Sequence, residues 1–165
     1  MARSLSERIA ARLVWGPVPE YAPELGRCLL WTGATYGKGY GKVGRGRRGE
    51  GAVDVHRAVY ELCTGEPIPE GMVVDHRCRV QSCARFSHLR AATQKQNTEN
   101  TVARAGGTSR HRGVSWDADR GKWTVHVGHQ YRNFYGGSFL DEDEAGEAAR
   151  LLRLRLHTHN DADRK

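Results

Sequence analysis

The sequence is poor in aromatic residues and has no long apolar stretch. Of its 165 residues, 8% are aromatic and 38% are hydrophobic. A chain this polar can bury only a thin core and needs a further stabilising element. No apolar run approaches the roughly 20 residues of a membrane helix, and the charged N-terminus lacks the apolar segment of a signal peptide. We therefore expect a soluble, cytoplasmic protein with no membrane partner.

Positive charge is in excess and unevenly spread. Lys and Arg total 26 against 19 Asp and Glu, a formal net charge of +7. Residues 1–105 hold 16 basic and 10 acidic residues, whereas residues 106–165 hold 10 and 9. The excess favours a polyanionic partner. The Gly-rich segment AGGTS at 105–109 is typical of a linker. We therefore expect a first domain at 1–104, a linker at 105–108, a second domain at 109–158 and a tail at 159–165 that is frayed after His159.

The sequence pattern predicts an α+β fold for the first domain. Ser4 and Glu7 have the spacing of a capping box, and Leu13 and Val14 continue the apolar positions at helical spacing, so a first helix is expected there. The other expected elements are strands at 29–31, 40–43, 53–55, 73–76 and 88–92 and helices at 56–63 and 94–103.

The second domain is expected to be a small three-stranded antiparallel sheet with one helix. The helix predicted at 141–157 begins with acidic and ends with basic residues, which suits the helix dipole. Its buried stripe includes Leu151, Leu152 and Leu156. The strands are predicted at 113–116, 122–127 and 131–135.

The cysteines favour a metal over disulfides, because the expected compartment is reducing. Cys78, Cys83 and His88 follow one another at short, regular spacing, which suits a tetrahedral zinc ion. Cys28, just before a predicted strand, is the preferred fourth ligand. Cys63 is the competitor, but its helical position is typical of a small core residue. The alternative is a set of unrelated buried thiols.

A second set of residues suggests hydrolysis. His76 ends a predicted strand and can act as a general base on water. Asp75 and Asn97 can hold a hard divalent cation through oxygen, and such a cation neutralises charge on a phosphate. Each of these residues alone is more often structural, so the argument depends on the pattern.

Residues 28–101 resemble the HNH homing-endonuclease family, in particular its zinc-containing members related to the His-Cys box nucleases. The resemblance lies in CLLWTG at 28–33, HRAVYEL at 56–62, IPEGMVVDH at 68–76 and TQKQN at 93–97, with Gln96 where the family usually has Glu. It implies a ββα-metal fold in which His76 is the general base. Asp75 and Asn97 would bind catalytic Mg²⁺ or another divalent cation, with ligation by Asp75 open and Asn100 the alternative to Asn97. Structural Zn²⁺ would be held by Cys28, Cys78, Cys83 and His88.

Residues 109–156 resemble the APETALA-type, or ethylene-response-factor, DNA-binding domain. The resemblance lies in RHRGVSW at 110–116, GKW at 121–123, GSF at 137–139 and EAGEAA at 144–149. It implies a sheet that lies in the DNA major groove with the helix packed behind. The residues expected to face DNA are Arg110, Arg112, Trp116, Lys122 and Trp123, although Trp123 is equally suited to the core.

Further basic residues are candidates for contact with the DNA backbone. Arg45, Arg47 and Arg48 lie in a Gly-rich hairpin tip, where charge is often merely solvated but could follow phosphates. Arg57 and Arg77 could contact the scissile phosphate.

These observations favour a site-specific, metal-dependent DNA endonuclease of the HNH homing type, encoded by a phage or another mobile element. Double-stranded DNA is the expected partner, with no small-molecule cofactor, and a nicking monomer is favoured over a dimer. One alternative is a DNA-binding regulator with an inactive nuclease module. Another is a zinc-ribbon scaffold that binds RNA or protein. The target sequence is not encoded in any recognisable way.

Overall fold

The computed structural model describes residues 3–20, 22–46, 49–101, 103 and 106–164. The chain forms two compact units, unit 1 (Met1–Asn97) and unit 2 (Thr98–Lys165). The division falls inside helix α3 (Gln94–Glu99), earlier than the linker expected at 105–108. None of the helices in the described part of the chain has the length and apolar content of a membrane span.

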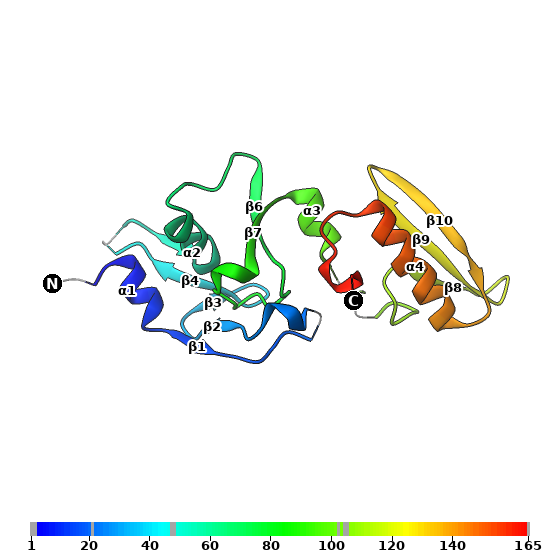
Figure 1. Ribbon diagram of the computed structural model, residues 1–165, viewed down its shortest axis with the longest axis horizontal. Helices are drawn as coiled ribbons and strands as arrows, with labels where there is room; N and C mark the ends of the chain where they lie inside the picture. The colour runs from blue at the N-terminus through cyan, green and yellow to red at the C-terminus, as the bar shows by residue number, and fades with distance from the viewer. Residues whose placement is uncertain (1–2, 21, 47–48, 102, 104–105, 165) are drawn as a thin grey trace. The chain divides into compact units, whose positions relative to one another are not determined.

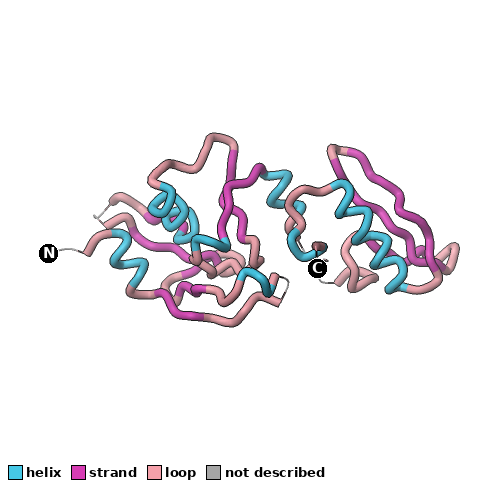
Figure 2. The backbone as a smooth tube through the Cα atoms, viewed as in Figure 1, coloured by secondary structure: helices cyan, strands magenta, loops and turns pink. Residues whose placement is uncertain are grey.

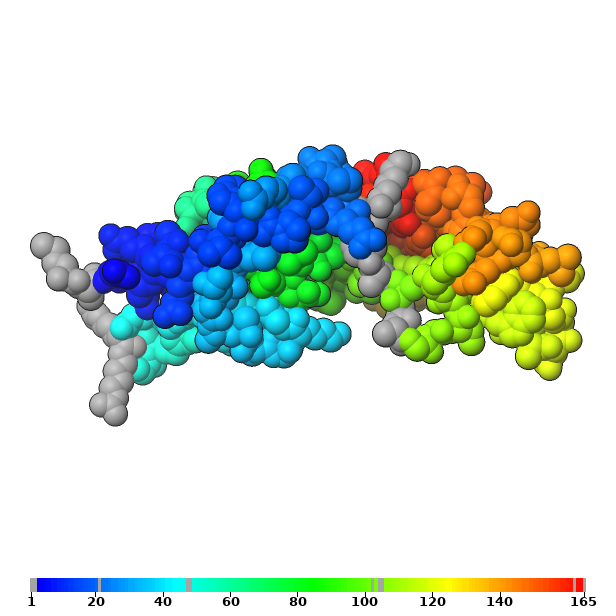
Figure 3. Space-filling model, turned by 90° about the horizontal axis from the view of Figure 1, so that it is seen from below, coloured from blue at the N-terminus to red at the C-terminus, as the bar shows by residue number. Residues whose placement is uncertain are grey.

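Unit 1 begins with a capped helix followed by a strand. Ser4 and Glu7 make both bonds of the capping box at the start of α1 (Leu5–Ala10). The helix ends earlier than expected, because residues Leu13–Trp15 form strand β1 and pair antiparallel with β2 (Leu29–Trp31). The expectation that Leu13 and Val14 lie on the helix is therefore wrong. The space-filling view shows the dark-blue N-terminal segment beside the light-blue chain that leads to β4 (Figure 3).

A three-stranded sheet and a helix follow. β3 (Thr35–Tyr36), β4 (Tyr40–Gly44) and β5 (Ala52–Asp54) pair in that order, so the expected hairpin is confirmed and gains a short strand. β5 leads directly into α2 (Val55–Thr64), which ends at left-handed Gly65. Of the hairpin-tip arginines, Arg45 is exposed, while Arg47 and Arg48 lie outside the described residues.

A second hairpin carries the residues of greatest interest. β6 (Met72–His76) pairs with β7 (Leu89–Thr93), and α3 follows directly (Figures 1 and 2). Thr93 and Gln96 exchange hydrogen bonds between side chain and backbone, which confirms Thr93 as the helix cap. The helix ends at Glu99, not near 103. The loop between β6 and β7 contains the short 3-10 turn Phe86–His88. A second 3-10 turn, Pro23–Leu25, contacts this loop, because the Leu25 carbonyl lies 2.9 Å from Nε2 of His88.

Trp31 organises the core of unit 1. Its ring is 6% exposed, and its Nε1 donates to the carbonyl of Ala34 at 2.9 Å. A Cβ added to Gly33 or Gly41 would lie 2.3 or 2.6 Å from ring atoms, so both positions exclude side chains. The buried cluster around this ring is formed by Ile9, Val43, Val55, Ala58, Val59, Val74, Ala84 and Leu89.

Unit 2 is a three-stranded antiparallel sheet covered on one face by a helix, as expected. The sheet order is β10 (Arg132–Phe139), β9 (Lys122–His129), β8 (Val114–Asp117). Helix α4 (Glu142–Leu156) packs across it (Figure 1) and is capped by Asp141. Leu151 is exposed, contrary to its expected place in the buried stripe, whereas Ala145 and Ala149 are buried against the sheet.

The C-terminal segment is packed, so the expectation of a frayed tail is wrong. Asn160 and Asp163 are buried next to the 3-10 turn at Asp161–Asp163. The Asp163 carboxylate accepts from Nε and Nη2 of Arg153 at 2.8 and 2.6 Å. Burial by itself raises the pKa of Asp163, but the Arg153 guanidinium and the Asn160 amide lower it below its usual value.

We predict that Asp163→Asn destabilises unit 2 by about 3 kcal/mol, because it leaves the buried Arg153 charge unpaired. The substitution also removes an acid-sensitive contribution. A carboxyl whose pKa is lowered by folding stabilises the protein above its unfolded pKa, and that contribution is lost as the pH falls through the folded value. Urea unfolding at neutral and acidic pH measures both effects. Asp119→Asn, in an exposed turn, is the control, and equal stability of the two variants would contradict the prediction.

Candidate functional site

Three thiols and an imidazole meet in unit 1. The potential ligand atoms of Cys28, Cys78, Cys83 and His88 all lie within 4.8 Å of one another. Each of the four residues is at most 1% exposed. The structure therefore brings together the four residues that the sequence analysis selected as zinc ligands.

Backbone pairing brings the distant Cys28 to this cluster. The segment just after Cys28 forms a bridge to the loop between β6 and β7, with Leu30 opposite Cys83. Trp31 donates its N–H to the Ser82 carbonyl at 2.8 Å, and Ala84 donates to the Leu29 carbonyl at 2.7 Å. A short piece of sheet thus fixes one thiol against a loop that carries the other two.

The spacing of the donors fits a tetrahedral metal ion. His88 Nδ1 lies 3.6 Å from Cys28 Sγ and 3.5 Å from Cys83 Sγ. A tetrahedral zinc with its usual bond lengths separates sulfur and nitrogen ligands by about 3.6 Å. His88 Nε2 lies 2.9 Å from the Leu25 carbonyl. Nη1 of Arg85 also lies 3.2 Å from Nε2, but it donates to the carbonyls of Leu25 and Arg27 at 2.9 and 2.7 Å. We therefore assign the proton to Nε2, which leaves the Nδ1 lone pair facing the thiols, as in metal-ligating histidines.

The thiols influence one another's ionisation. Burial, with Cys83 nearby, raises the pKa of Cys28 to about 11. Its hydrogen bond to Cys83 and burial raise the pKa of Cys78, while the same hydrogen bond lowers the pKa of Cys83 to about 5. One thiolate is therefore favoured when no metal is bound, and a metal must displace protons from the other two.

Cys63 takes no part in the cluster. It is exposed on α2, so it is neither the fourth ligand nor the small core residue that its helical position suggested. Val55, Ala58 and Val59 form the buried face of that helix, which leaves Cys63 on the outside.

His76 is held in a defined orientation beside the cluster. It is 7% exposed, and its Nε2 lies 3.0 Å from the backbone carbonyl of Cys83. A carbonyl only accepts, so Nε2 carries the proton and Nδ1 keeps its lone pair. Burial lowers the pKa of His76, and the ring is therefore neutral near pH 7. A neutral imidazole with a lone pair on Nδ1 can accept a proton.

Two aromatic neighbours of His76 were not assigned a role from the sequence. The His56 ring centroid lies 4.8 Å from that of His76, and the Tyr40 centroid lies 5.9 Å away. Burial lowers the pKa of His56 to about 4, so this ring is neutral too. His56 is in the first turn of α2, on the buried helix face that also holds Val55 and Val59. A histidine on an otherwise apolar helix face is the sequence feature from which its role could have been predicted.

The two expected cation ligands are placed differently. Asp75 is 4% exposed and faces Arg90 across the hairpin, accepting from Nε at 2.9 Å and pairing with Nη2 at 2.8 Å. Asn97 is half-buried on α3. This helix begins after Thr93, which pairs with Met72 at the start of β6, whereas Asp75 lies near the end of that strand. Asn100 is buried in the turn after α3 and belongs to unit 2.

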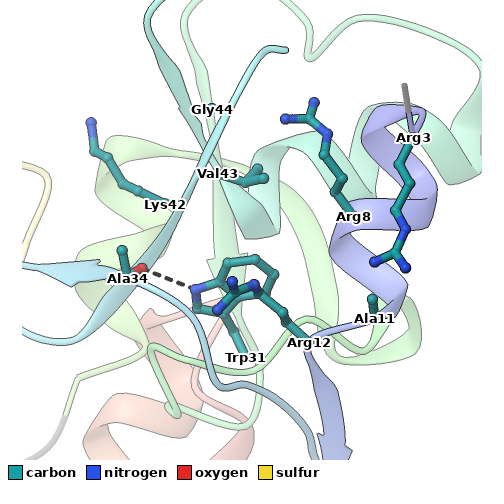
Figure 4. Close-up of a pocket in the computed structure, with 9 residues that line it drawn as sticks. All are labelled: Arg3, Arg8, Ala11, Arg12, Trp31, Ala34, Lys42, Val43 and Gly44. Carbon is teal, nitrogen blue, oxygen red and sulfur yellow. Dashed lines mark hydrogen bonds between the residues drawn. The ribbon is translucent and has the colours of Figure 1, made fainter. Parts of the chain in front are cut away.

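A basic pocket in unit 1 was not expected. Its volume is about 470 Å³, and Trp31 forms part of its wall. Arg3 and Arg8 project from the α1 region, Arg12 follows, and Lys42 extends from β4 (Figure 4). Arg8 also donates to the Arg45 carbonyl at the hairpin tip. The other expected contact residues, Arg57 on α2 and Arg77 after β6, are half-buried.

The two arginines expected to face DNA in unit 2 have partners within the protein. Arg110 Nη2 lies 2.5 and 2.6 Å from the carboxylate oxygens of Asp143. Arg112 donates to the carbonyls of Thr98, Glu99 and Thr101.

The tryptophans of unit 2 lie on the helix side of its sheet. Trp123 packs against the core beneath α4, and Trp116 is its cross-strand partner with ring centroids 5.0 Å apart. The expectation that Trp116 faces DNA is therefore wrong, and of the two interpretations of Trp123 the structure favours the core, because side chains alternate between the two faces of a strand. By that alternation Lys122 and His126 lie on the open face, where Tyr135 is paired with His126.

Comparisons with known proteins match a nuclease family to part of the chain. A family model described as HNH endonuclease matches residues 53–99. The chain is 39% identical over 77 residues to Protein 7.7 of Escherichia phage T7, covering 47% of this chain and 56% of that protein. It is 35% identical over 75 residues to Protein 2.8 of the same phage, covering 46% and 49%. The chain thus spans about half the length of these two relatives.

A further phage protein is matched over most of its length. The chain is 32% identical over 106 residues to Protein 3.8 of Escherichia phage T7, covering 63% of this chain and 83% of that protein. No solved structure matches the chain. The chain therefore belongs to the family of Protein 3.8 of phage T7, and it contains an HNH endonuclease domain at residues 53–99.

Proposed function

We propose that this protein is a metal-dependent endonuclease that hydrolyses a phosphodiester bond of double-stranded DNA. The observation that carries the proposal is the orientation of His76 within the HNH match. Its Nε2 is held by the Cys83 carbonyl at 3.0 Å, so its Nδ1 would be the atom that accepts a proton. The net charge of +7 supports a polyanionic substrate.

In the proposed reaction, His76 Nδ1 accepts a proton from the water that attacks phosphorus. His56 and Tyr40 pack around His76 and act as positioning residues for its ring. A divalent cation such as Mg²⁺, held by the oxygens of Asp75 and Asn97, would neutralise charge on the phosphate and the leaving oxygen. At Asp75 such a cation competes with the Arg90 ion pair. That competition is the observation that favours the alternative of an inactive nuclease module in a DNA-binding regulator.

We propose that the cluster of Cys28, Cys78, Cys83 and His88 binds structural Zn²⁺. The donor set, its burial and the sulfur–nitrogen spacing all suit a closed tetrahedral site. Because the Cys83 carbonyl orients His76, this ion would also fix the catalytic base.

We propose that unit 2 is an ethylene-response-factor-type domain that adds DNA affinity and sequence preference. A three-stranded sheet with one helix-covered face and one open face supports this. The DNA contacts would come from the open face, through Lys122, His126 and Tyr135, rather than from Trp116 and Trp123. Homing-type activity, mobile-element origin and nicking by a monomer belong to the same proposal.

We predict that His76→Ala lowers the rate of DNA cleavage at least about 100-fold, the usual contribution of a general base. DNA binding should stay within about twofold of wild type, because this neutral, buried ring contributes no charge. The assay is conversion of a supercoiled plasmid carrying phage DNA in the presence of Mg²⁺, with a gel shift on the same DNA. Open circles indicate nicking, and linear product would contradict the monomeric nickase. Binding without cleavage by the wild-type protein would favour the regulator.

We predict that Cys78→Ser removes one zinc per chain and unfolds unit 1, since the binding energy of a structural zinc is folding energy of about 10 kcal/mol or more. Cys63→Ser is the matched control, because this thiol is exposed and outside the cluster. Metal analysis and circular dichroism of the full chain measure both effects. A Cys78→Ser protein that loses one zinc equivalent while unit 1 stays folded would refute the structural role.

We predict that Arg12→Ala, in the basic pocket, weakens DNA binding for all sequences alike. The slope of log affinity against log salt concentration should fall by about one for each phosphate that the variant no longer neutralises. Arg155→Ala changes the net charge equally at an exposed position on α4 and is the control. Equal salt slopes for the two variants would exclude the pocket from the DNA-binding surface.

A further inference from the structure

A second group of potential metal ligands lies wholly within unit 2. Glu99 on α3, His129 at the end of β9 and His157 at the end of α4 have their ligand atoms within 4.8 Å of one another. Glu99 and His157 are 4% and 6% exposed. The His129 side chain is 15% exposed. All three residues lie in unit 2, apart from the proposed nuclease site of unit 1.

The two imidazoles present unpartnered nitrogens. His157 Nε2 lies 3.1 Å from the Gly128 carbonyl, so Nε2 carries the proton and Nδ1 keeps its lone pair. Nδ1 of His157 and Nδ1 of His129 are both buried and have no hydrogen-bond partner among the described residues. A buried polar atom left unsatisfied is costly, and a bound ion would remove that cost at both nitrogens.

The carboxylate of Glu99 is held in place for the same centre. Its Oε2 accepts from the backbone N–H groups of Thr158 and His159 at 2.9 and 3.3 Å. Its Oε1 lies 3.8 Å from His129 Nδ1, too far for a hydrogen bond. Oxygen and nitrogen ligands of a tetrahedral zinc lie about 3.4 Å apart, so a small inward shift would complete the coordination.

We propose that Glu99, His129 and His157 bind a divalent transition-metal ion, with Zn²⁺ the expected one. Two imidazoles and one carboxylate are a donor set that suits zinc and leave a fourth position for water. The ion would join the ends of α3, β9 and α4. This would stabilise a unit whose hydrophobic core is small. The competing explanation is a metal-free pair between the carboxylate and a protonated imidazole.

The guanidinium of Arg112 is a positive charge near the site, and it would oppose the binding of a cation. This guanidinium donates to the carbonyls of Thr98, Glu99 and Thr101, so this positive charge is held by backbone oxygens beside the site.

The test is the metal content of the full chain after saturation with Zn²⁺ and removal of loosely held ion. We expect two equivalents per chain in the wild type and one in His157→Gln and His129→Asn. His126→Asn is the matched control and should keep both, since this exposed histidine lies on β9 outside the cluster. A wild type with one equivalent, or histidine variants that keep two, would overturn the proposal.

A second variant separates loss of metal from loss of fold. Glu99→Gln retains an oxygen that can accept from Thr158 and His159, but a neutral amide is a weaker ligand. It should keep the circular dichroism of the wild type and bind one equivalent fewer. With Co²⁺ as probe, the absorption that disappears should lack sulfur-to-metal charge transfer, because this site has no thiolate. Disappearance of a thiolate band would instead assign the missing ion to the cysteine cluster and contradict a separate site.

Discussion

The geometry of unit 1 depends on the contact between β2 and the loop that joins β6 to β7. This contact places Cys28 against Cys78, Cys83 and His88, and the carbonyl of Cys83 then orients His76. A candidate metal-binding cluster and a candidate general base thus share one residue, Cys83, through its side chain and its backbone. Because the surrounding core is thin, the orientation of the His76 ring depends on the cluster that holds Cys83 in place.

Much of this site could be predicted because its residues are close in sequence. Cys78, Cys83 and His88 fall within one loop, and their spacing alone indicates a metal. His56 and Tyr40 could not be found in this way, because only the packing of α2 and β4 against β6 brings their rings to His76. The pairing of Asp75 with Arg90 is likewise a property of the strand register, which a single sequence does not reveal.

The predictions from sequence that proved wrong have one physical cause: the residues concerned interact with residues far away along the chain. The residues after Ala10 have apolar positions at helical spacing. They form a strand instead, because pairing with β2 satisfies their backbone hydrogen bonds and outweighs the local preference for helix. The residues after His159 are polar and look unstructured, yet Asp163 is buried because Arg153 on α4 pairs with it. Arg112 counted toward a DNA-binding surface, but its guanidinium donates to backbone carbonyls of its own unit. A charge is visible in a sequence, whereas its partner is not.

The thin core that the composition implies therefore has two different consequences. In unit 1 the potential donors are mainly cysteines, whose thiolates are soft ligands and would form a closed site. In unit 2 the proposed donors are two imidazoles and a carboxylate, which bind more weakly and leave one position open. Only the first set shows a recognisable spacing, since Glu99, His129 and His157 are widely separated along the chain. If both sites hold metal, each small unit compensates for few apolar contacts with a coordination centre that ties distant segments together.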